Sequence, residues 1–186
     1  MTRTTAALFF TRWITHFCAP VFFLLTGTGA YLSLRRKSKR ELSRFLFTRG
    51  LWLIFLELAL FRSLGFQFTF DHPVTVLNVL WALGWAMIVL SVLVRIPLSV
   101  TTALGLIMIA GHNLLDSIQS SNSVWSILHS PNFILKNPQH SVLIAYPLIP
   151  RVGVTAVGYS LGRLCLDMAA ALETNLKLNS HLDFPR

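Results

Sequence analysis

Long apolar stretches alternate with short polar ones along this chain, and five of the apolar stretches are long enough to be membrane-spanning helices. A transmembrane helix needs roughly 20 consecutive, mostly apolar residues. The five predicted segments are Leu8–Leu34, Phe45–Leu64, Val74–Val94, Leu98–Leu115 and Ser141–Leu166. The pattern therefore predicts an all-α fold, a polytopic integral membrane helix bundle with about five transmembrane helices. We expect one transmembrane domain over residues 8–170 and a polar C-terminal tail over residues 171–186.

The composition supports a membrane location over a soluble one. Only 12% of the 186 residues are charged and 54% are hydrophobic, whereas soluble domains have about 25% charged residues. The net charge of +9 would suit a nucleic-acid partner, but much of the basic excess lies in a single connection. The lipid bilayer is therefore the expected partner, and a nucleic acid is not expected.

That connection, Arg35–Arg44, carries six Lys or Arg in ten residues and lies between the first two apolar segments. Short basic loops remain on the cytoplasmic side of a membrane. The connections 65–73 and 116–140 hold few basic residues, so we expect them outside. The resulting topology has the N-terminus outside and the C-terminus in the cytoplasm. The same basic charge argues against a cleaved signal peptide, because it would hold the following chain inside.

Several ionisable residues fall inside the apolar segments, where charge is costly and usually kept for a function. Arg12 and His16 are four residues apart, so they share a helix face; Arg12 also suits a snorkelling position at the interface. Glu57 lies near the middle of the second segment. We expect it to face the bundle interior, either protonated or paired with Arg12 or with Arg151.

Two other features concern packing. Pro147 and Pro150 interrupt the fifth segment and predict a broken helix with freed backbone carbonyls. Five glycines predict thin faces for close helix contact, namely Gly27, Gly29, Gly153, Gly158 and Gly162. The two cysteines have no neighbours at metal-ligand spacing, so no metal site is expected, and the common catalytic motifs of soluble enzymes are absent.

Four stretches of this sequence together resemble a known family. They are Phe10–Phe22 (FTRWITHFCAPVF), Arg49–Glu57 (RGLWLIFLE), Trp81–Trp85 (WALGW), and Tyr146–Pro150 (YPLIP) with Gly158-Tyr159. Their order and spacing are similar to those of bacterial membrane proteins grouped with the catalytic domain of heparan-α-glucosaminide N-acetyltransferase. The resemblance extends from about Leu8 to Leu166.

The resemblance implies an acyltransferase in a bacterial cytoplasmic membrane, with acetyl-CoA as the donor and an amino sugar or cell-envelope glycan as the acceptor. The family's usual first helix, its catalytic histidine and its later helices have no counterpart in this sequence. We therefore expect an incomplete member, truncated at both ends. A homo-oligomer or missing helices from another chain are further candidate partners.

Acyl transfer to an amine needs a base for the attacking nitrogen and stabilisation of the oxyanion. We predict one outward-facing polar cluster of His16, Arg12 and Glu57 as the catalytic group. In the basic connection, the candidates for binding coenzyme A phosphates are Arg35, Arg36, Lys37 and Arg40; contact with lipid headgroups explains these residues equally well. Two other functions remain open: a transporter-like protein, which the broken fifth helix would suit, and a non-enzymatic fragment or assembly partner.

Overall fold

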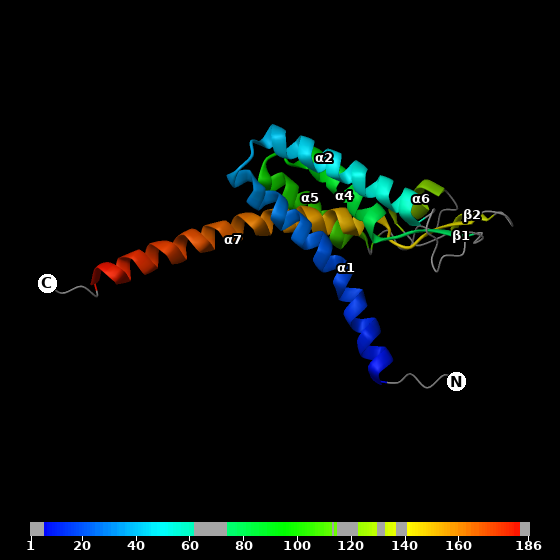
Figure 1. The fold of residues 1–186 in the computed structure, drawn as a ribbon, viewed down its shortest axis with the longest axis horizontal. Coiled ribbons are helices and arrows are strands. Elements are labelled where there is room, and N and C mark those ends of the chain that lie inside the picture. Colours follow the sequence, from blue (N-terminus) through cyan, green and yellow to red (C-terminus); the bar gives the residue numbers. More distant parts are fainter. Residues whose placement is uncertain are drawn as a thin grey trace.

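The computed structural model describes residues 6–61, 74–112, 114, 123–129, 133–136 and 141–182. Within these residues, five helices of 15 residues or more form a bundle (Figure 1). They are α1 (Ala6–Leu32), α2 (Lys39–Leu56), α4 (Val79–Leu93), α5 (Leu98–His112) and α7 (Leu148–Leu182). A 3₁₀ turn (Ser33–Arg35) follows α1, and a π-helical turn (Glu57–Phe61) follows α2. The all-α class is thus confirmed for most of the described chain.

A small sheet at one end of the bundle is an addition to the predicted fold. It contains β1 (Val74–Leu77), β2 (Phe133–Lys136) and β3 (Ser141–Ile144) in the order β1-β3-β2, with β1 parallel and β2 antiparallel to β3. The short helix α6 (Ser123–Leu128) lies at the same end (Figure 1). The predictions of helix from Val74 and from Ser141 are wrong for these first four residues, because the two runs pair with each other instead.

The prediction of a broken fifth helix is also wrong. Pro147 precedes α7, and Pro150 lies in its first turn. A proline is tolerated there because the first amides of a helix have no acceptor within the helix. From Leu148 the helix continues without a break to Leu182. It therefore crosses the predicted boundary at residue 170, and the described part of the polar tail is helical.

Close contacts between glycines set the spacing of three helix pairs. Gly27 of α1 packs against Gly158 of α7, and Gly50 of α2 against Gly84 of α4. A Cβ added at Gly50 would lie 2.6 Å from the carbonyl oxygen of Gly84, which is too close for a real contact. Gly105 of α5 and Gly153 of α7 form a third such pair. Small residues allow membrane helices to approach closely and to gain van der Waals contact.

Two buried clusters lie along the bundle. One, near the sheet, contains Phe23, Trp81, Ile144 and Val152 with their neighbours. The other, near the connection between α1 and α2, includes Leu42, Leu46, Leu90 and Tyr159. Interhelical hydrogen bonds support the packing; for example, the hydroxyl of Thr28 donates to the carbonyl of Gly158 over 3.0 Å.

The helices expose many large apolar side chains on their outer surface. Large exposed side chains include Phe22 and Leu25 on α1, Trp52 and Phe55 on α2, and Leu106 and Ile107 on α5. Within the described chain, Phe17–Arg35 is the one helical stretch both long and apolar enough to cross a membrane; α4 and α5 are apolar but have 15 residues each. The prediction of about five spans therefore stays a prediction.

Candidate functional site

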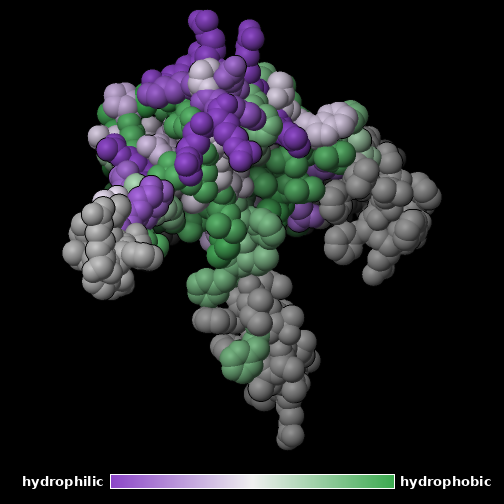
Figure 2. Space-filling view, turned by 60° about the vertical axis from the view of Figure 1, so that its left-hand side comes forward, coloured by the Kyte–Doolittle hydropathy of each residue, from purple (hydrophilic) through white to green (hydrophobic). Residues whose placement is uncertain are grey.

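The connection between α1 and α2 forms a basic end of the molecule. Hydrophilic side chains gather over this end in Figure 2. Ser38 begins α2 with a capping box: its hydroxyl accepts from the amide of Glu41, and the Glu41 carboxylate accepts from the amide of Ser38 over 2.8 Å. These bonds to Ser38 hold the pKa of Glu41 below its ordinary value. The Glu41 carboxylate is thus bonded to Ser38 at the start of α2. It does not pair with the neighbouring arginines.

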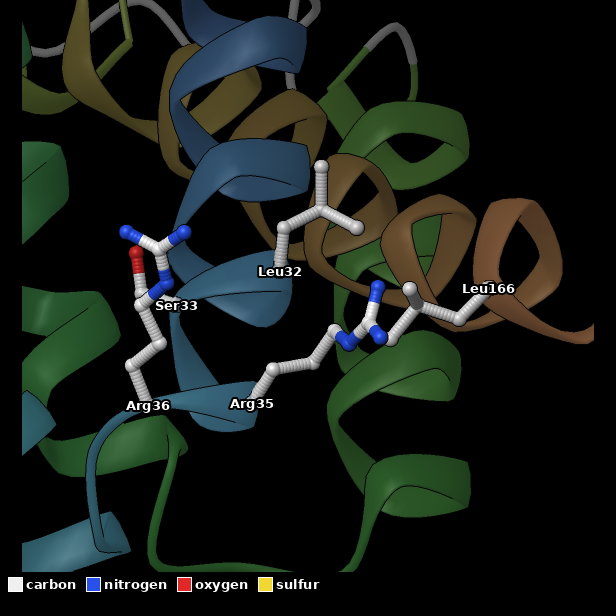
Figure 3. A pocket seen from close by; sticks show the side chains of 5 residues that line it. All are labelled: Leu32, Ser33, Arg35, Arg36 and Leu166. Atoms are coloured by element: carbon white, nitrogen blue, oxygen red, sulfur yellow. The ribbon is translucent and has the colours of Figure 1, made fainter. Parts of the chain in front are cut away.

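A shallow hollow of about 580 Å³ opens at this basic end, between the end of α1 and α7. It is lined by Leu32, Ser33, Arg35, Arg36 and Leu166. Figure 3 shows Arg35 reaching toward Leu166 of α7, while Arg36 lies on the other side of Leu32. No acidic side chain lines the hollow. Two guanidinium groups beside apolar side chains suit an anion that also carries an apolar part, because arginine binds phosphate oxygens with paired donors.

The four predicted phosphate-binding residues are not equivalent. Arg35 and Arg36 line the hollow. The ammonium of Lys37 lies 3.5 Å from the centre of the Phe45 ring, and Arg40 is exposed on the first turn of α2. The structure therefore brings together two of the four residues; Lys37 and Arg40 remain near the hollow without lining it.

Glu57 lies at the opposite end, in the π-helical turn after α2, and is only 2% exposed. Its Oε1 accepts a hydrogen bond of 2.9 Å from the amide of Asn78, the residue that precedes α4. The amides of Leu80 and Trp81 also face the carboxylate. A carboxylate at a helix N-terminus is stabilised by these free amides and by the helix dipole. Oε2 is buried and has no hydrogen-bond partner of normal geometry among the described residues.

The first turns of α4 and α7 lie side by side near Glu57. Leu77 pairs with Ile144 in the parallel β1-β3 ladder, and the amide of Ala145 donates to the carbonyl of Leu77 over 3.2 Å. Arg151, in the first turn of α7, has its guanidinium 5.4 Å from the centre of the Tyr146 ring. The predicted ion pair between Arg151 and Glu57 is not formed. Within the described chain, the partners of Glu57 are backbone amides.

The remaining predicted catalytic residues, Arg12 and His16, belong to α1, whose first turns project away from the rest of the bundle (Figure 1). Their side chains lie outside the described residues. The predicted cluster of these two residues with Glu57 therefore stays a prediction.

The structure also shows a group of aromatic and imidazole rings that the sequence analysis did not identify. The ring of His129 is 4% exposed and lies between Trp125, with ring centres 5.0 Å apart, and His112, with ring centres 4.5 Å apart. No sequence motif relates His112 at the end of α5 to His129 after α6. Among the described residues, no group of three His, Cys, Asp or Glu could hold a metal ion.

Comparison with known proteins identifies the family of the chain. Residues 1–183 match the family described as heparan-alpha-glucosaminide N-acetyltransferase, catalytic. No curated protein and no solved structure matches the chain. The family name indicates membrane enzymes that transfer acetyl groups. Because the match covers nearly the whole chain, this protein belongs to the heparan-α-glucosaminide N-acetyltransferase catalytic-domain family.

Proposed function

We propose that this chain acts in a bacterial cytoplasmic membrane as an N-acetyltransferase, or as part of one, that moves an acetyl group from acetyl-CoA to the amine of an amino sugar across the membrane. The family match over residues 1–183 is the observation that carries this proposal. Two features at opposite ends of the bundle fit this proposal. One is a basic hollow without acidic lining residues, and the other is a buried carboxylate at the far end of α2.

The orientation rests on the arrangement of the basic elements. Arg95, in the turn between α4 and α5, donates to the hydroxyl of Ser43 near the start of α2. The α4-α5 turn, the α1-α2 connection and the exit of α7 at Arg163 therefore lie at one end. Short basic connections remain in the cytoplasm. In the proposed five-span bundle, the basic end is cytoplasmic and the sheet end, like the N-terminus, is outside.

At the cytoplasmic end, Arg35 and Arg36 would hold the phosphates of the donor. Coenzyme A carries several negative charges and an apolar arm, and the hollow combines two guanidinium groups with Leu32 and Leu166. Lys37 and Arg40 would add to the local positive potential without direct contact.

In the transfer, the amine nitrogen forms a bond to the acetyl carbon, the thioester C–S bond breaks with coenzyme A leaving as its thiolate, and the nitrogen loses a proton. A base within hydrogen-bond reach of the nitrogen would accept this proton. The predicted base is His16, and Arg12 would orient the carboxylate of Glu57. The buried carboxylate of Glu57 supports a role at the outer end, since it is the acidic group that the described chain holds there, against the amide of Asn78.

The decisive experiment measures transfer of labelled acetyl from acetyl-CoA to glucosamine in inside-out membrane vesicles containing the full chain. The double substitution Arg35→Ala with Arg36→Ala should raise KM for acetyl-CoA about tenfold and leave kcat nearly unchanged. This is the low end for charge-assisted hydrogen bonds, because both side chains are exposed and screened. Arg44→Ala removes an equally exposed arginine from α2 and should leave KM unchanged.

Equal effects of the double substitution and Arg44→Ala would show that the hollow does not bind the donor. Absence of transfer by the unmodified chain, even with vesicles rich in donor and acceptor, would favour an assembly partner that needs helices from another chain. The transporter-like alternative loses its main support, because α7 is unbroken from Leu148.

A further inference from the structure

Helix α2 lies along an edge of the bundle and packs against α4 through Gly50 (Figure 1). One side of α2 carries the half-buried Phe45 and three exposed side chains, those of Arg49, Trp52 and Phe55. Trp52 and Phe55 are each 56% exposed. At 100° per residue, the four side chains fall within an arc of about 120° around the helix. They therefore form one continuous surface along α2.

Two cationic groups meet at the basic end of this surface, beside the ring of Phe45. The ammonium of Lys37 lies 3.5 Å from the ring centre, and the central guanidinium carbon of Arg49 lies 5.2 Å from it. A cation within about 6 Å of an aromatic ring centre is attracted to the ring. Lys37 belongs to the turn before α2 and Arg49 to the helix itself, so the ring holds cations from two elements in one place.

No carboxylate of the described chain neutralises these two cations. Neither Lys37 nor Arg49 forms an ion pair or a hydrogen bond with a described residue. The one acidic residue between them in the sequence is Glu41, and its carboxylate is bonded to Ser38. Lys37 and Arg49 are therefore available to an anion, and both ammonium and guanidinium groups bind phosphate oxygens well.

Trp52 and Phe55 continue the surface away from the basic end. Their rings are stacked, with centres 5.3 Å apart and planes inclined by 14°. Phe55 lies ten residues beyond Phe45, which is about 15 Å along a helix, whereas the hydrocarbon core of a bilayer is about 30 Å thick. The surface therefore extends over about one leaflet, with its cations at the level of the headgroups and its flat apolar pair at the level of the acyl chains.

We propose that Lys37, Phe45, Arg49, Trp52 and Phe55 form a binding site for one anionic phospholipid of the cytoplasmic leaflet. The lipid phosphate lies between the two cationic groups, and an acyl chain lies along the stacked rings. Charge complementarity selects this occupant, because the cationic headgroup of a zwitterionic lipid is repelled by Lys37 and Arg49. Basic side chains on the cytoplasmic side of membrane proteins bind anionic lipids in this way. The inference uses the proposed membrane orientation but not the acetyl transfer.

Fluorescence quenching in lipid nanodiscs tests the site, with phosphatidylglycerol brominated on its acyl chains as the probe. The chain has five tryptophans, so the signal of Trp52 is the difference between the unmodified chain and Trp52→Phe. In phosphatidylcholine nanodiscs, brominated phosphatidylglycerol should quench Trp52 at a mole fraction about 25-fold lower than brominated phosphatidylcholine does. This is about fivefold for each basic side chain near an anionic lipid. Equal quenching by the two lipids would overturn the proposal.

A pair of double substitutions locates the preference. Lys37→Gln with Arg49→Gln should abolish it, and the fold should survive because neither side chain has a hydrogen bond in the described chain. Arg35→Gln with Arg40→Gln removes the same charge from the same end and should keep the preference. Arg35 lies beside α7, and Arg40 lies about 140° around α2 from Phe45. An equal loss in the two double variants would show diffuse attraction to the basic end and would overturn the site. No acetyl-CoA is present, so the result is independent of acetyl transfer.

Discussion

Glu57 is the residue whose environment explains most about the sheet end of the molecule. A carboxylate at this position in an apolar helix would be costly unless its charge were stabilised. Its Oε1 accepts from Asn78, so it joins the end of α2 to the start of α4. The same bond satisfies one of the amides that a helix start leaves without an acceptor. Glu57 therefore has a structural function regardless of its part in catalysis.

Substitutions at Glu57 should separate these two functions. Glu57→Gln keeps an oxygen acceptor for Asn78 and should unfold close to the unmodified chain, whereas Glu57→Leu leaves that amide unsatisfied. We expect Glu57→Leu to cost about 1–3 kcal/mol in the free energy of unfolding, measured by denaturant titration in detergent micelles. If the charge also serves transfer, Glu57→Gln should lose activity while staying folded. Equal stability of the two variants would argue against the capping role.

The sequence predicted correctly that Glu57 is buried, but not what stabilises it. Arg151 seemed a suitable partner because both residues lie in apolar segments, yet its guanidinium packs against Tyr146. The actual partner is the first turn of α4, 21 residues further along the chain. The position of this turn depends on where α4 begins. The sequence does not show that start, because the apolar run from Val74 continues through it.

At the scale of elements, pairs of glycines determine how closely the helices pack. The backbones of α2 and α4 meet at Gly50 and Gly84, and each glycine would place a Cβ against the other's carbonyl oxygen. In the contact between α1 and α7, a Cβ at Gly27 would meet the carbonyl oxygen of Thr155, and one at Gly158 that of Leu24. Helices in lipid gain little from the hydrophobic effect, so this close packing is a main source of their association.

Alanine at the contact glycines should therefore destabilise the bundle. Gly50→Ala or Gly84→Ala should lower the free energy of unfolding by about 1–3 kcal/mol, the usual cost of overpacking. Gly29→Ala is the control, because a Cβ there meets nothing within 4 Å and alanine favours the helix. Unfolding by detergent titration measures all three. A loss at Gly29→Ala as large as at Gly50→Ala would contradict the packing role.

The expected glycine contacts are confirmed at Gly27, Gly153, Gly158 and Gly162, whereas the one at Gly29 is wrong. Composition identifies small residues, but only the rotation of α1 about its axis decides which of them meets α7.

The strands β1 and β3 also depend on tertiary structure. Each is an apolar run of four residues that a helix could also contain, and their pairing across 67 residues of sequence is a tertiary event.

At the scale of the molecule, the basic elements gather at one end although they are far apart in sequence. The capped start of α2 and the α4-α5 turn are joined by the hydrogen bonds of Arg95 to Ser43. The hollow joins the end of α1 to Leu166 of α7. Successive long helices run alternately toward this end and away from it (Figure 1). This alternation is what a five-span topology requires.

Labelling of single cysteines should report this topology. In a background without Cys18 and Cys165, Leu114→Cys lies near the end of α5 and should react with a membrane-impermeant maleimide on intact cells. Lys39→Cys, at the basic end, should react only in inverted vesicles, since basic connections remain inside. Both positions are exposed in the structure. Reaction of both from the same side would contradict the proposed arrangement.

The sequence by itself determined the class of the fold, the basic end and the family, because these depend on composition, on local charge and on motifs that can be read without coordinates. The predicted start of the second helix at Phe45 is wrong: α2 begins after Ser38, where a local capping box with Glu41 starts the helix within the basic connection. Only the tertiary structure decided which arginines line the hollow and that Glu57 stabilises the start of α4. Each of these depends on the packing of segments distant in sequence, which local patterns do not specify.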